Sequence, residues 1–130
     1  MREVQVSSDG SKLGQDITIG GFRLRADEPT DKGGSDTGPE PHEFVLTALG
    51  ACTAMTLRLY AERKGWPLNG VHVRLTGGPG EGKYSITRHI AMDGELDAEQ
   101  RARLLEIANK CPVHRTLTGE VAIETKEVPA

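Results

Sequence analysis

The chain has few aromatic residues and few cysteines. Only 4% of its 130 residues are aromatic, and it holds two cysteines, Cys52 and Cys111. Its net charge of −3 gives no basic excess, so we expect no nucleic-acid partner. No uninterrupted apolar run approaches the roughly 18 residues of a membrane span. Residues 1–6 lack the apolar stretch of a signal peptide, so we expect a cytoplasmic protein with no membrane partner.

The order of predicted elements favours one α+β domain over residues 1–130. Residues 1–28 alternate apolar and polar positions between turn signals, which predicts a three-stranded meander. Residues 29–40 predict a loop, and residues 41–64 a long central helix. Residues 71–130 predict two strands, a helix and a last strand, so that two helices pack against antiparallel or mixed sheets. The elements of this last part are strands at 71–75 and 84–92, a helix from about 97 to 110, and a strand at 120–126.

The central helix has clear signals at both ends. Pro41 suits the first helical position, Glu43 complements the positive end of the helix dipole, and Gly65 is placed for a left-handed stop. Between Phe44 and Leu57 the apolar residues cover more than one stripe, so we expect other structure on most sides of this helix. Because aromatic residues are scarce, part of that packing points to a partner subunit.

A glycine-rich segment at residues 77–83 matches the spacing of a phosphate-binding loop up to Lys83. Tyr84 stands where serine or threonine would ligate magnesium, and a strand follows where that motif needs a helix. We therefore predict a hairpin connection here.

Cys52 lies inside the central helix among the small residues Ala48, Gly50, Ala51 and Ala54. Small side chains let another element approach closely, so tight packing is expected at this point. Free cysteine is often only a small buried hydrophobe, and that interpretation of Cys52 stays open.

Cys111 directly precedes Pro112, which predicts that the cysteine is the N-cap of a short turn. Free backbone N–H groups there favour a thiolate over a thiol, and His114 and Arg115 add positive potential. Cys111 and His114 also form half of a zinc motif, but zinc wants about four ligands and no second half is present. We therefore expect no metal and no cofactor, while a purely structural cysteine stays open.

Two of these segments together resemble a known family. The run from Gly38 to Thr56, GPEPHEFVLTALGACTAMT, followed much later by Cys111-Pro112-Val113, is similar to the OsmC/Ohr family, in its OsmC-like branch. The resemblance implies an intertwined homodimer of α+β fold, with the long helices packed centrally and the sheets outside. It also implies a peroxidase that reduces organic hydroperoxides in an antioxidant stress response.

The resemblance assigns a role to each cysteine. Cys52 would attack a small hydroperoxide as a thiolate and become a sulfenic acid, and Cys111 would condense with it to a disulfide. An external thiol or a lipoyl-type carrier would then reduce the disulfide. Because burial alone raises the pKa of a thiol, such a site needs a nearby cation or hydrogen-bond donors.

The chain departs from the family at the groups that support the thiolate. Peroxidase members take an arginine from the loop before the helix and a glutamate from the helix start, but residues 27–40 contain no arginine, and the glutamate position falls on His42. Either His42 or His114 is a hypothetical activating group, and each can equally be a solvated helix-end histidine. The supporting candidates are therefore His42, Glu43, Arg23, Arg25 and His114.

A second function of another class competes with the peroxidase. The missing loop arginine favours a non-catalytic dimer that binds a small ligand or senses redox state, with the cysteines as packing or slowly reacting residues. A purely structural dimer is weaker, because nothing in that role requires two separated thiols in such settings.

Overall fold

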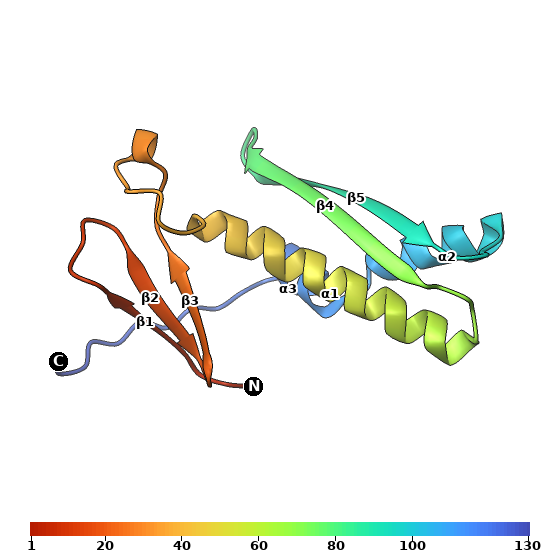
Figure 1. Cartoon of the computed structure of the whole chain (residues 1–130), viewed down its shortest axis with the longest axis horizontal. Coiled ribbons are helices and arrows are strands. Elements are labelled where there is room, and N and C mark those ends of the chain that lie inside the picture. The colour runs from red at the N-terminus through yellow and green to blue at the C-terminus, as the bar shows by residue number, and fades with distance from the viewer. The chain divides into compact units, whose positions relative to one another are not determined.

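The computed structural model describes all of residues 1–130 and has an α+β fold (Figure 1). Its residues form two compact units, Met1–Thr47 and Ala48–Ala130. The helix α1, at Pro41–Lys64, begins in the first unit and ends in the second, with the bounds that the sequence predicts. Gly65, at φ +71°, ends this helix in the left-handed conformation expected of it.

The first unit contains the predicted meander. Strands β1 (Val4–Ser8), β2 (Gln15–Ile19) and β3 (Phe22–Ala26) form an antiparallel sheet in the order β1-β2-β3. Ile17 pairs with Val6 on one side and Leu24 on the other, so the apolar positions share one face. A pocket of about 450 Å³ lies over this face and is lined by apolar residues of the sheet together with Pro41 and Phe44.

The loop between β3 and α1 is ordered by one buried carboxylate. Asp27 is only 3% exposed and accepts hydrogen bonds from the backbone N–H of Glu28, and from both the backbone N–H and the hydroxyl of Thr37. A short 3-10 helix, η1 (Thr30–Lys32), lies in the loop between Glu28 and Thr37. Three donors on one carboxylate fix the two ends of the loop against each other.

The second unit packs the rest of α1 with a hairpin and two helices. Strands β4 (Gly70–Pro79) and β5 (Tyr84–Asp93) are antiparallel, and the glycine-rich segment connects them as predicted. Helix α2 (Ala98–Ala108) starts with the predicted capping box, in which Asp97 and Gln100 exchange hydrogen bonds. The core contains the buried residues Leu57, Ala61, Leu68, Leu104, Ile107 and Ala108.

Tight packing near Cys52 is confirmed at Gly50. A methyl group added there would lie 2.8 Å from Leu75 Cδ1 of β4, closer than real side chains approach. The glycine thus lets this strand side chain sit against α1, close in sequence to the cysteine.

Two expectations need correction. A third helix, α3 (Pro112–Thr118), follows α2, where the sequence predicted only a short turn. The strand predicted at 120–126 is absent, because no strand edge pairs with this segment in the single chain. The single chain also buries only one stripe of α1, while Met55 and Leu59 are 66% and 63% exposed. By length and composition α1 could cross a membrane, a property that core helices of soluble proteins share.

We expect Asp27→Asn to destabilise the first unit at neutral pH, because both carboxylate oxygens accept hydrogen bonds and an amide has only one oxygen. In either orientation its NH2 group would face a donor of Glu28 or Thr37. The Thr37 hydroxyl is the main cause that lowers the pKa of Asp27 below its ordinary 3.8, followed by the backbone N–H of Glu28. The carboxylate's contribution is therefore present above pH 3.8 and is lost as the pH falls through the lowered value.

Thermal unfolding of both proteins over this pH range provides the measurement. The difference in Tm between wild type and Asp27→Asn should disappear in acid. The matched variant Asp31→Asn, at an exposed position of η1, should have the Tm of wild type throughout. A difference that stays constant down to the most acid sample would contradict this role of Asp27.

Candidate functional site

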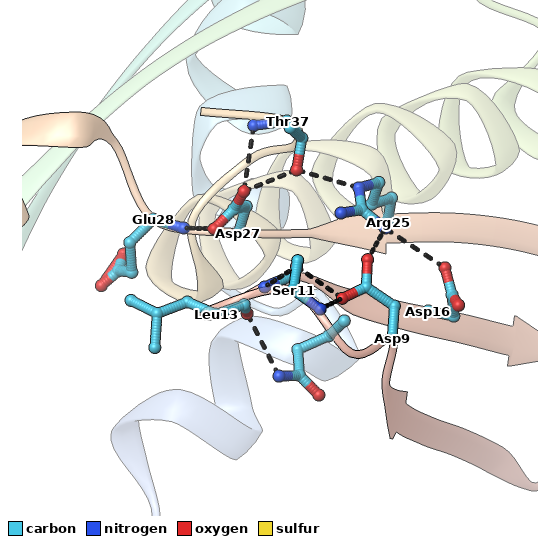
Figure 2. A network of polar contacts seen from close by, with 10 residues as sticks. Asp9, Ser11, Leu13, Asp16, Arg25, Asp27, Glu28 and Thr37 are labelled. Carbon is cyan, nitrogen blue, oxygen red and sulfur yellow. Dashed lines mark hydrogen bonds and ion pairs between the residues drawn. The ribbon is translucent and has the colours of Figure 1, made fainter. Parts of the chain in front are cut away.

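The arginines of the third strand are held within the first unit. Arg25 forms ion pairs with Asp9 at 2.6 Å and Asp16 at 3.3 Å, and donates to the Thr37 hydroxyl at 2.9 Å (Figure 2). Hydrogen bonds from Ser11, and then the Arg25 guanidinium, hold the pKa of Asp9 at about 2. Arg23 is exposed on the same strand. Arg25 therefore balances carboxylates around the meander.

The two candidates at the start of α1 lie on its exposed first turn. Glu43 accepts a hydrogen bond from the backbone N–H of Glu40 at 2.8 Å, so its carboxylate caps the helix. His42 is exposed beside it. Both residues belong to the first unit, whereas the two cysteines belong to the second.

Cys111 occupies the predicted N-cap of α3. Its backbone is extended, Pro112 follows at the first helical position, and its Sγ accepts a hydrogen bond from the backbone N–H of His114 at 3.3 Å. The side chain is fully buried, and Sγ lies 4.0 Å from the hydroxyl of Thr53 on α1. The structure thus brings Cys111 and His114 together and places this thiol against the residue that follows Cys52.

Cys52 has a more open setting than Cys111. It is half-buried, and its Sγ lies 4.0 Å from the Thr56 hydroxyl one turn along α1. Both cysteines are free. Successive residues of a helix point about 100° apart, so Cys52 is turned from Thr53 toward the exposed side of α1. One thiol is thereby open to small molecules, and the other is enclosed by protein.

Arg88 of β5 is the centre of the polar contacts around Cys111. Its Nη1 donates to the Thr53 hydroxyl at 2.9 Å. Its Nη2 donates to Asn109 Oδ1 at 3.0 Å and to His114 Nδ1 at 3.2 Å. The guanidinium therefore connects β5 to α1, to the C-terminal end of α2 and to α3.

Arg88 also determines the tautomer of His114. A guanidinium has no acceptor, so the Nδ1 atom of the histidine must accept and the ring proton must lie on Nε2. Burial and then the positive charge of Arg88 lower the pKa of His114 below its ordinary 6.5. At neutral pH the histidine is an uncharged acceptor, and Arg88 carries the positive charge of the cluster.

A pocket of about 420 Å³ opens beside these residues. One part of its lining is apolar, and the other part contains Arg88, Asn109 and His114 together with Tyr84 and Thr118. The apolar residues are Leu49, Ile86 and Leu117. Such a lining suits a small molecule with an apolar body and one polar end.

Comparison with known proteins identifies the family. The model of the OsmC-like protein family matches residues 33–126. The chain belongs to this family. No curated protein is found to match the chain.

Solved structures of OsmC-like proteins have the same fold. An OsmC-like protein from Mycoplasma pneumoniae superposes with a TM-score of 0.75 at 21% identity, covering 92% of this chain and 88% of that one. An organic hydroperoxide resistance protein OsmC from Legionella pneumophila gives 0.67 at 21% identity, covering 92% and 90%. The organic hydroperoxide resistance protein OhrB of Bacillus subtilis gives 0.64 at 19% identity, covering 92% and 91%. At these identities the likeness shows the fold alone.

Sequence reasoning missed the central residue of this OsmC-like site. Arg88 lies between Ile86 and Ile90 on the half-buried face of β5, where alternation would place an apolar side chain. A charged residue at an inward position is the signal that could have found it. Thr53 and Asn109 gave no comparable signal, because their role depends on contacts with Arg88.

We expect stability to fall in mild acid because His114 must stay neutral to accept from Arg88. Its pKa is lowered in the fold, so its contribution is complete above pH 6.5 and is lost as the pH falls through the lowered value. Protonation would remove the acceptor and place two positive charges side by side.

Chemical unfolding of wild type and His114→Gln from neutral pH to about pH 5, below the ordinary histidine pKa, tests this expectation. The glutamine oxygen can accept from Arg88 at any pH, so the variant should lose less stability in acid. His89→Gln, on the exposed face of β5, is the matched control and should behave as wild type. Parallel curves for wild type and His114→Gln would refute the assignment.

Proposed function

We propose that this OsmC-like chain is a thiol peroxidase that reduces small organic hydroperoxides. The observation that carries the proposal is the position of the buried Cys111 sulfur, which lies 4.0 Å from the Thr53 hydroxyl. Thr53 directly follows the half-buried Cys52 on α1. Solved structures of the same fold are named organic hydroperoxide resistance proteins, which supports a peroxide-related role.

The proposed reaction has two steps at sulfur. The Cys52 thiol attacks the hydroperoxide, the O–O bond breaks, and the products are a sulfenic acid and an alcohol. The Cys111 thiol then attacks the Cys52 sulfur, forming the disulfide and releasing water. An external thiol or lipoyl-type reductant of the cytoplasm returns both thiols.

The different exposure of the two cysteines supports this division of roles. A thiol that meets a hydroperoxide must be reachable, and Cys52 is half-buried whereas Cys111 is enclosed. A resolving thiol must instead be held near one site, and Cys111 is fixed by its N-cap hydrogen bond and by Thr53.

We propose further that two chains form a homodimer through α1. The exposed side of α1 in the second unit carries the stripe Ala48, Ala51, Met55 and Leu59, opposite the buried stripe that contains Thr53 and Leu57. Cys52 lies beside the exposed stripe, so a partner helix would shield the reacting sulfur from bulk water. The apolar tail residues Val121 and Ile123 are exposed as well, and could pair with a strand of the partner.

Replacing Cys52 with serine should abolish hydroperoxide consumption, because the attacking sulfur is lost. Cys111→Ser should consume about one equivalent and stop at the sulfenic acid, since no thiol remains to resolve it. Reduced protein freed of dithiol is mixed with cumene or tert-butyl hydroperoxide, and peroxide loss and protein mass are followed. A dithiol is added only to measure the repeated turnover of wild type.

The Cys52→Ser/Cys111→Ser double variant measures the background from methionine oxidation. If wild type consumes no more hydroperoxide than this variant, the peroxidase proposal fails. The ligand-binding alternative, in which the cysteines only pack or react slowly, would then be the better account.

Leu59→Glu should weaken dimerisation at least tenfold, because burying a leucine side chain contributes about 1.5–3 kcal/mol and two-fold symmetry places it in the interface twice. Light scattering after size-exclusion chromatography over a dilution series measures the change. Leu105→Glu on α2, at a leucine that is 48% exposed, is the control and should stay dimeric. A monomeric wild type at all concentrations would exclude the dimer.

A further inference from the structure

Arg88 carries a positive charge that no carboxylate of the chain balances. Its acceptors are a hydroxyl, an amide oxygen and a neutral imidazole, and none of the ion pairs in the structure includes it. Arg25, by comparison, pairs with two aspartates. A half-buried guanidinium with only neutral partners favours an anion formed nearby.

The Thr53 hydroxyl connects this charge to the Cys111 sulfur. The hydroxyl has one proton, which it donates to the Leu49 carbonyl at 2.7 Å, and two lone pairs. One lone pair accepts from Arg88 at 2.9 Å, so toward Cys111, at 4.0 Å, the oxygen can only accept from the S–H group. In the reduced protein the thiol of Cys111 is therefore the donor of this contact.

The same hydroxyl can reverse its direction when Cys111 loses its proton. A hydroxyl hydrogen rotates freely, so Thr53 can turn its proton from the Leu49 carbonyl to the sulfur anion. The hydrogen bond from Arg88 polarises the O–H group and makes it a stronger donor. The backbone N–H of His114 already points at the sulfur from the other side.

We infer that Arg88, acting through the Thr53 hydroxyl, is the positioning residue that prepares Cys111 to attack the Cys52 sulfur. The inference rests on the proposed function and names the group that supports its second step. The positive charge comes from β5, whereas the family resemblance implied an arginine from the loop before α1. The supported thiol is the resolving Cys111.

The step balances without an added reactant. The Cys111 S–H bond and the S–O bond of the Cys52 sulfenic acid break, the S–S bond forms, and the proton leaves with the hydroxide as water. The polar contacts of Cys111 come from the uncharged Thr53 of α1 and the backbone of His114, whose ring is neutral, and Arg88 of β5 donates to both residues. Lys110 and Arg115 are its charged neighbours along the chain. Arg88 is thus the charged group joined to this thiol by hydrogen bonds.

The test separates the two cysteines with a chromogenic aryl disulfide in place of peroxide. The half-buried Cys52 exchanges first and releases one aryl thiol, and Cys111 then displaces the second from the mixed disulfide. We expect Arg88→Gln to slow the second release about tenfold, the low end for loss of a neighbouring opposite charge, while the first release changes less than about twofold. Arg88→Lys should restore part of the rate, because it returns the charge without the fork of donors.

Matched variants exclude a merely structural effect. Arg74→Gln, at an exposed position on β4, should leave both releases unchanged. Thr53→Ser should keep the second release and Thr53→Val should slow it, which tests the link even if Arg88→Gln folds poorly. An unchanged second release in Arg88→Gln and Thr53→Val, or equal slowing of both releases, would overturn the inference.

The same variants with a hydroperoxide show whether the effect reaches the proposed reaction. Arg88→Gln should accumulate the Cys52 sulfenic acid, trapped by dimedone and read by mass spectrometry. A wild type in which hydroperoxide forms neither a sulfenic acid nor a Cys52–Cys111 disulfide would refute the peroxidase, while the aryl disulfide result would still decide the role of Arg88. The two failures are therefore distinguishable.

Discussion

One guanidinium, held by three uncharged acceptors, links four elements of the second unit. Arg88 reaches α1 through Thr53, the end of α2 through Asn109 and α3 through His114. A bidentate carboxylate would hold an arginine more tightly, but it would also cancel its charge. Neutral acceptors fix the direction of the side chain and leave its positive potential at the site. Arg88 thus links four elements and, in the reaction proposed above, also supplies positive potential beside Cys111.

Helix α1 has one buried face and one exposed face. The buried stripe through Leu49, Thr53 and Leu57 packs inside the second unit, and Thr53 brings the Cys111 contact to this side. The opposite stripe with Met55 and Leu59 is exposed, and Cys52 lies beside it. Cys52 therefore lies near the exposed face of α1, whereas the contact with Cys111 lies on its buried face. The small residues between the stripes let neighbouring elements approach, as Leu75 does at Gly50.

Much of this could be predicted from the sequence where the signal is local. The ends of α1, the capping box at Asp97 and the N-cap position of Cys111 depend on residues close along the chain. The strand at 120–126 was wrong because alternation gives a segment two faces but does not supply an edge to pair with. The role of Arg88 could not be found in the same way, since its three partners are 21 to 35 positions away. The family resemblance implied an arginine before α1, but Arg25 forms ion pairs with Asp9 and Asp16.

The identity of the charged residue decides how such a site responds to pH. A histidine that supports a thiolate does so only while it is protonated, so its help fades as the pH rises through its pKa, just where thiols begin to ionise. An arginine stays charged throughout, and here burial and then the charge of Arg88 lower the pKa of His114, whose Nδ1 accepts from the guanidinium. Arg88 and His114 therefore have separate roles, both of which the sequence had suggested for a histidine. Arg88 provides a constant positive potential, and His114 orients it while its backbone N–H holds the Cys111 sulfur.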